Sequence, residues 1–92
     1  MNASAAYREQ LRLSLLRFLD NNASARGLSA ALLMQMARSE GRPTLDLATV
    51  NAELQYLLDK KLLADVGKII SPELAAFRIS ADGRDFVAAN IE

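Results

Sequence analysis

The spacing of the apolar residues changes near residue 61 from helical to alternating. Val50, Leu54 and Leu57 follow one another at the three- and four-residue intervals of an amphipathic helix. Residues 62–80 instead contain β-branched residues and an alternation of apolar and polar side chains. Helices that precede strands, rather than alternate with them, predict an α+β fold.

The helical part of the chain divides into three predicted helices. The first covers residues 6–20, the second residues 30–40 and the third residues 46–60. A loop over residues 23–29 separates the first two. The side chains expected to face the core are Tyr7, Leu11, Leu15 and Phe18 in the first helix, Leu32, Leu33 and Met36 in the second, and Val50, Leu54 and Leu57 in the third, with Phe77 packed against them.

Residues that begin and end helices stand at these boundaries. Ser29 and Asp46 are expected N-caps, because their side-chain oxygens can accept hydrogen bonds from the free N–H groups of a first turn. Gly41 follows the second helix, where a C-terminal glycine is common. Cationic Lys60 suits the negative end of the third helix. The three helices therefore have local signals at their ends as well as helical spacing within them.

The second part of the chain predicts a β-hairpin followed by a short helix. Residues 62–70 and 74–80 are the expected strands, with a turn at residues 71–73. Ser80 is the expected N-cap of a last helix over residues 81–89.

Composition restricts the kind of function. The 92 residues suit one domain with its core over residues 7–90. There is no cysteine and no histidine, and the carboxylates are scattered singly. We therefore expect no enzyme activity, no metal, no cofactor and no small-molecule ligand. No apolar run approaches the roughly 20 residues that span a membrane, and the N-terminus lacks a signal-peptide pattern. A cytoplasmic protein is expected.

Three motifs resemble those of winged helix-turn-helix proteins. Residues 54–63, LQYLLDKKLL, resemble L-x-x-L-x-x-x-G-L-V at the end of a winged-helix third helix. Residues 77–83, FRISADG, resemble the F-x-[LI]-T-x-x-G that closes the wing. Residues 11–19 match the opening LR-x-x-[LI]-L-R-x-L of small winged-helix proteins encoded by Mu-like phages and prophages. This resemblance covers nearly the whole chain and implies three helices, a two-stranded wing and a short last helix.

The chain departs from that pattern at Lys61, which stands where the family usually has glycine. If the register holds, Lys61 takes a left-handed conformation at a cost of about 1 kcal/mol. Winged helices serve many roles, so the fold alone does not give the activity.

The first functional hypothesis is a regulator that binds double-stranded DNA through the third helix and the wing. Asn51 and Gln55 could pair with adenine edges, while Ala52 and the Thr49 methyl group could contact thymine methyl groups. The expected phosphate contacts are Arg38, Arg42 and Lys68. The alternative is that these side chains form an ordinary solvated surface.

The distribution of charge opposes this hypothesis. The net charge is zero, although DNA-binding domains are usually basic. Residues 44–59 contain Asp46, Glu53 and Asp59 and no basic residue. In the usual docking, Glu53 and Asp59 would stand near phosphates and repel them.

The second hypothesis is a protein-interaction or assembly module without DNA binding. At 100° per residue, Leu13 lies about 160° and Leu16 about 130° from the stripe expected to face the core. Together with Phe86 and Val87 of the last helix, they predict a homodimer interface. The alternative is that Leu13 and Leu16 pack within their own chain. Tyr56 is a further candidate for partner contact, unless it lies against the wing.

Overall fold

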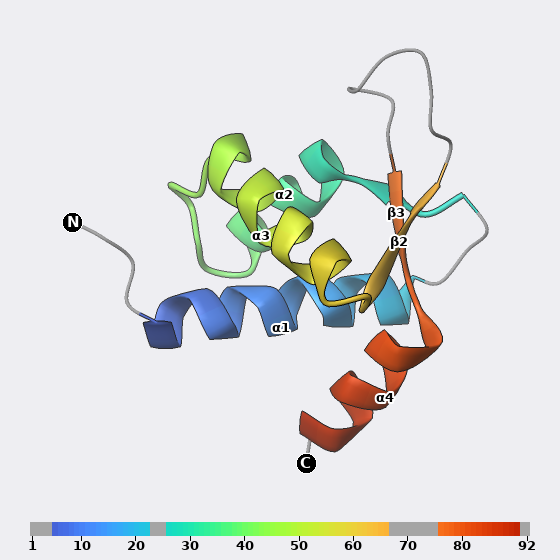
Figure 1. Ribbon diagram of the computed structural model, residues 1–92. Coiled ribbons are helices and arrows are strands. Elements are labelled where there is room, and N and C mark those ends of the chain that lie inside the picture. The colour runs from blue at the N-terminus through green and yellow to red at the C-terminus, as the bar shows by residue number, and fades with distance from the viewer. Residues whose placement is uncertain (1–4, 23–25, 67–75, 91–92) are drawn as a thin grey trace.

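The computed structural model describes residues 5–22, 26–66 and 76–90 (Figure 1). Its elements are α1 (Ala5–Asn21), β1 (Leu28–Ser29), α2 (Ala30–Ser39), α3 (Leu47–Asp59), β2 (Leu63–Val66), β3 (Ala76–Ile79) and α4 (Ala81–Asn90). This α+β arrangement agrees with the expected fold class and is compatible with a winged-helix-like fold. The predicted turn at 71–73 and the wing residue Lys68 lie outside the described residues.

Three serine and aspartate side chains act as the sequence predicts at helix N-termini. Ser29 Oγ accepts a hydrogen bond from the Leu32 N–H at 3.2 Å, and Asp46 Oδ1 accepts one from the Thr49 N–H at 2.9 Å. Ser80 Oγ accepts from the Gly83 N–H at 2.9 Å. Each bond satisfies a backbone donor that has no partner within its helix. The predicted starts of α2, α3 and α4 are confirmed.

The sheet formed by the described residues has three strands, not the two of the predicted hairpin. Strands β2 and β3 pair antiparallel as expected, and β1 pairs with the other edge of β3 in the order β1-β3-β2. The expectation of a loop over residues 23–29 is therefore wrong at Leu28 and Ser29. A two-residue strand is too short to show alternation. The close approach of β1 to β3 requires glycine at position 27, because any side chain there would collide with the Phe77 carbonyl oxygen.

Helix α1 lies at the centre of the fold, between α4 on one side and α2 and α3 on the other (Figure 1). It also contacts β3. Because neighbours cover it on several sides, α1 buries residues on more than one face. The buried apolar residues of the described chain are Leu11, Leu15, Leu16, Leu19, Leu33, Ala37, Leu45, Val50, Leu54, Leu57, Leu63, Ile79 and Val87. The predicted core face of α3 is confirmed by Val50, Leu54 and Leu57.

Four predictions of side-chain orientation are wrong. Leu16 has no exposed surface, and Val87 is 3% exposed, so both belong to the core of their own chain and not to an outward face. The enclosure of α1 explains both, since α4 closes over the side of α1 that was expected to face solvent. Leu32 and Tyr7 were expected to be buried but are exposed. The helical spacing of the apolar residues on α2 does not distinguish the exposed Leu32 from the buried Leu33.

The turn after α3 contains the left-handed residue that the motif predicts. Lys61 has φ 64°, and it is a positive-φ residue other than glycine. Its N–H donates to the Leu58 carbonyl at 2.9 Å, and the Leu62 N–H donates to the Leu57 carbonyl at 3.0 Å. These two bonds form a Schellman motif, which normally places glycine at the left-handed position. Lysine therefore occupies a conformation that glycine adopts without steric cost.

Replacing Lys61 with glycine is expected to raise the free energy of unfolding by about 1 kcal/mol, because it removes the left-handed penalty. Lys60→Gly is the matched control, since Lys60 has right-handed helical geometry and should lose about 0.5–1 kcal/mol. Urea denaturation measures both. A Lys61→Gly variant no more stable than the wild type would contradict the strain.

Candidate nucleic-acid interface

The outward face of α3 begins at its N-cap. Asp46 accepts the Thr49 N–H, and hydrogen bonds from the Thr49 side chain and backbone lower the pKa of Asp46. Asp46 is therefore ionised at neutral pH, at the positive end of the helix dipole. Thr49 is half-buried, whereas Asn51, Ala52 and Gln55 are exposed. The structure thus presents three of the four predicted base-reading residues to solvent on one helix.

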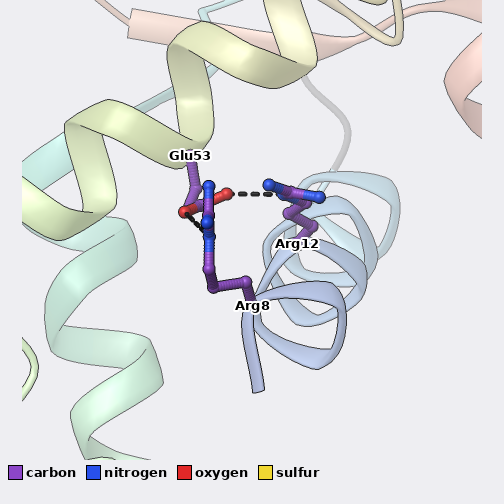
Figure 2. A network of polar contacts seen from close by, with 3 residues as sticks. All are labelled: Arg8, Arg12 and Glu53. Atoms are coloured by element: carbon purple, nitrogen blue, oxygen red, sulfur yellow. Dashed lines mark hydrogen bonds and ion pairs between the residues drawn. The ribbon is translucent and has the colours of Figure 1, made fainter. Parts of the chain in front are cut away.

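The Glu53 side chain does not lie on this exposed face but is buried. It is 5% exposed and lies where α3 crosses α1 (Figure 2). Arg12 Nε donates to Glu53 Oε1 at 2.5 Å, and Arg8 Nε donates to Glu53 Oε2 at 3.3 Å. Each carboxylate oxygen therefore has its own arginine, which offsets the cost of burying the charge. The expectation that Glu53 would stand beside DNA phosphates is wrong.

The sequence contained a signal for this ion-pair network. Arg8 and Arg12 are four residues apart and so lie on one side of a helix. Glu53 is the single acid in the middle of α3, between Val50 and Leu54. A lone carboxylate beside a core stripe, with two arginines on another helix, fits a paired charge better than a solvated one.

Arg12 also connects Tyr56 to this network. Its guanidinium carbon lies 3.7 Å from the centroid of the Tyr56 ring, and Lys60 Nζ lies 5.9 Å from the same centroid. These are cation–π distances. Among the described residues, Tyr56 thus contacts Arg12 of α1 and Lys60, the C-cap of α3. It keeps 39% of its surface exposed.

Gln55 and Asp59 form a second polar pair on α3. Gln55 Nε2 donates to Asp59 Oδ1 at 3.0 Å, one helical turn along. The bond uses one amide N–H of Gln55. The other amide N–H and the carbonyl oxygen remain for a further partner.

The two arginines before α3 take part in contacts within the chain. Arg38 Nε donates to the Leu45 carbonyl at 2.7 Å, which fixes the connection between α2 and α3. Arg42 Nη1 donates to Glu40 Oε1 at 3.1 Å, and its guanidinium lies 5.7 Å from the Tyr7 ring centroid. Arg38 nevertheless stays exposed, whereas the Arg42 side chain is only 15% exposed. Arg38 is therefore the more accessible of the two predicted phosphate contacts.

A separate groove brings together two of the four predicted dimer residues. Its volume is about 420 Å³, and it lies between α1, α3 and α4. Leu13 of α1 and Phe86 of α4 line it, with Tyr56 of α3. The remaining lining residues are Glu9, Gln10, Arg12, Leu57, Lys60, Leu62 and Asn90. Leu13 is half-buried and Phe86 is exposed, so this groove keeps part of the predicted interface accessible.

Three further observations concern possible metal sites, membrane-spanning helices and similar proteins. Within residues 5–22, 26–66 and 76–90, there is no group of three or more acids that could hold a metal ion. None of the described helices has the length and apolar character needed to cross a membrane. No family model, curated protein or solved structure matches the chain.

Replacing Arg12 with alanine is expected to lower the free energy of unfolding by about 3 kcal/mol, because it leaves the Glu53 carboxylate, whose side chain is 5% exposed, with only the half-exposed Arg8 as a partner. Arg8→Ala should cost less than about 1 kcal/mol, since the Arg8 side chain is half exposed. Urea denaturation of both variants gives the comparison.

Arg42→Ala is the matched control for Arg12→Ala, because the Arg42 side chain is about as little exposed as that of Arg12, but its partner Glu40 has a 41% exposed side chain. It should cost less than about 1 kcal/mol. Equal losses for Arg42→Ala and Arg12→Ala would contradict a special role for the buried pair.

Proposed function

We propose that the protein is a non-enzymatic DNA-binding regulator that inserts the outward face of α3 into the major groove. The observation that supports this proposal best is the burial of Glu53 against two arginines. This burial removes one negative charge from the surface of residues 44–59, the segment whose acidic residues oppose DNA binding. Between Asp46 and Asp59, the exposed face of α3 then contains no charged side chain.

The side chains on this face have the chemistry of base recognition. Asn51 and Gln55 each offer an amide that can pair with adenine through two hydrogen bonds, and Ala52 can contact a thymine methyl group. Asp59 accepts one N–H of Gln55. The other N–H and the carbonyl oxygen of Gln55 are still enough for the two hydrogen bonds to adenine. Asp59 itself repels phosphates, so it lowers affinity while it orients Gln55.

Phosphate contacts would come from exposed cations at both ends of α3. Arg38 precedes the helix, and Lys60 and Lys61 follow it. Lys68 stays a proposed wing contact. So few cations imply modest affinity and a shallow dependence on salt, because each phosphate contact adds about 0.9 to the slope. The resemblance to proteins of Mu-like phages makes phage regulatory regions suitable first probes.

In a gel-shift assay at low salt, the protein is expected to bind selected duplexes in preference to random DNA. Asn51→Ala and Gln55→Ala should each lose about 1–3 kcal/mol of discrimination at one base pair. Arg38→Ala should weaken binding to every sequence and reduce the salt slope by about 1.

Gln35→Ala is the matched control for Gln55→Ala, since Gln35 is an exposed amide on α2, and it should keep the wild-type base preference. The absence of any shifted duplex at low salt would reject the proposal, because non-specific binding is strongest there.

A homodimer through the groove between α1, α3 and α4 is a second proposal, and it does not require DNA binding. Exposed Phe86 and Tyr56 beside half-buried Leu13 give the groove an apolar lining. The same groove contains Glu9 together with Lys60. A two-fold axis that runs between Glu9 and Lys60 would bring the acid of one copy near the base of the other, which is the self-complementarity that an isologous interface needs.

Light scattering at micromolar concentration is expected to give the mass of a dimer for the wild type and of a monomer for Phe86→Glu, because the new carboxylate cannot be buried unpaired. Leu32→Glu is the control, since Leu32 on α2 is exposed to a similar extent and does not line the groove. A monomeric wild type, or a dimeric Phe86→Glu variant, would refute this interface.

A further inference from the structure

The groove between α1, α3 and α4 and the base-reading face of α3 are neighbouring surfaces of one helix. Tyr56 and Lys60 line the groove, and the base-reading face consists of the exposed residues Asn51, Ala52 and Gln55. At 100° per residue, Tyr56 is rotated by about 40° from Ala52 and lies about 6 Å further along the helix. Lys60, at the C-cap, continues the same row by about another 40° and 6 Å.

Tyr56 lies on the flank of α3 that would face a wall of the major groove. Its position is about 90° around the helix from the middle of the base-reading face. An α-helix with its side chains is about 10–12 Å across, and the major groove is about 12 Å wide. A helix inserted with its base-reading face against the base edges therefore leaves no room for a second protein chain beside Tyr56. A second copy seated in the groove contacts Tyr56, because Tyr56 is part of its lining.

The Lys60 ammonium group has a partner in each of the two proposed complexes. Its nitrogen lies 5.9 Å from the centroid of the Tyr56 ring, on the same flank of α3. In the DNA complex it would contact a phosphate, and in the homodimer it would lie near the Glu9 carboxylate of the second copy. A carboxylate beside Lys60 would neutralise its charge and repel an approaching phosphate. The shared cation thus opposes simultaneous binding, as the shape of the helix does.

We propose that dimerisation through this groove and insertion of α3 into DNA exclude each other, so that the homodimer is a form of the protein that does not bind DNA. This inference rests on both proposed functions and adds the coupling between them. The coupling is reciprocal, because a dimer that excludes DNA is itself dissociated by DNA. A rising protein concentration favours the dimer and lowers the fraction of chains that can bind.

The test compares the wild type with Phe86→Glu, which is expected to be monomeric. A short fluorescent duplex with one sequence selected by gel shift is kept at trace concentration, and anisotropy gives the ratio of bound to free duplex. At about ten times the dissociation constant of the wild-type dimer, mass action leaves about one fifth of the chains monomeric. At that protein concentration, Phe86→Glu should give a ratio about fivefold higher than the wild type. Its added negative charge alone would lower the ratio.

Ala88→Glu is the matched control for Phe86→Glu. Ala88 is also exposed on α4 but does not line the groove, and it is rotated by about 160° from Phe86 around the helix. This variant makes the same change of charge, so it should stay dimeric and bind duplex within twofold of the wild type. A ratio for Phe86→Glu that does not exceed those of the wild type and Ala88→Glu would overturn the proposal.

Sedimentation of the wild type with an excess of the same duplex needs no variant. The dimer is expected to dissociate into complexes of one chain per duplex, and a complex of one duplex with an intact dimer would overturn the inference alone. A wild type that is monomeric without DNA would overturn it together with the homodimer. The absence of bound duplex at low salt would overturn it together with DNA binding. The three failures are therefore distinguishable.

Discussion

The carboxylate of Glu53 is buried where α3 crosses α1, and this position requires positive partners from α1. Arg12 and Arg8 supply them, one for each carboxylate oxygen (Figure 2). Since a buried charge without a partner costs several kcal/mol, the pair restricts how α3 can lie on α1. A shift of α3 along α1 would separate Glu53 from these arginines.

This ion-pair network also shapes the surface that α3 presents. It withdraws one acid from the outward face and places Arg12 beneath Tyr56, at 3.7 Å from the ring centroid. Arg12 therefore packs at the edge of the core. Because its charge is paired with Glu53, it does not add to the positive potential that attracts DNA. The proposed base-reading face is consequently close to neutral, and recognition by hydrogen bonds would matter more there than attraction to phosphates.

A second junction fixes the sheet to the end of α3. The Leu62 carbonyl accepts the Ser80 N–H at 3.1 Å, and Ser80 Oγ donates to the Lys61 carbonyl at 2.9 Å. Gly83 packs so closely on the Leu62 carbonyl that a side chain would collide with it. The motif over residues 77–83 thus has a structural explanation, because serine and glycine there join the start of α4 to the turn after α3. The left-handed Lys61 is part of the same junction.

Local features of the sequence predicted the helices, their N-caps and the left-handed Lys61, because each depends on neighbouring residues. The positions of Leu16 and Val87 could not be predicted in this way. Their burial depends on α4 closing over α1, which the periodicity of one helix does not contain. Strand β1 escaped prediction because two residues show no alternation.

In the candidate site too, features that depend on neighbouring residues could be predicted, and features that depend on packing between helices could not. Exposure of Asn51, Ala52 and Gln55 agreed with helical spacing, whereas the burial of Glu53 required knowledge of the facing helix. Arg38 and Arg42 looked like free cations in sequence, yet they bond to Leu45 and Glu40.

The Glu53–Arg12 contact holds α3 on α1, and a double-mutant cycle with Glu53→Ala and Arg12→Ala measures its strength. Urea denaturation of the wild type, the two single variants and the double variant gives the coupling energy. We expect about 1–3 kcal/mol, because contacting residues in one network are not additive. Losses that add to within about 0.3 kcal/mol would contradict the account.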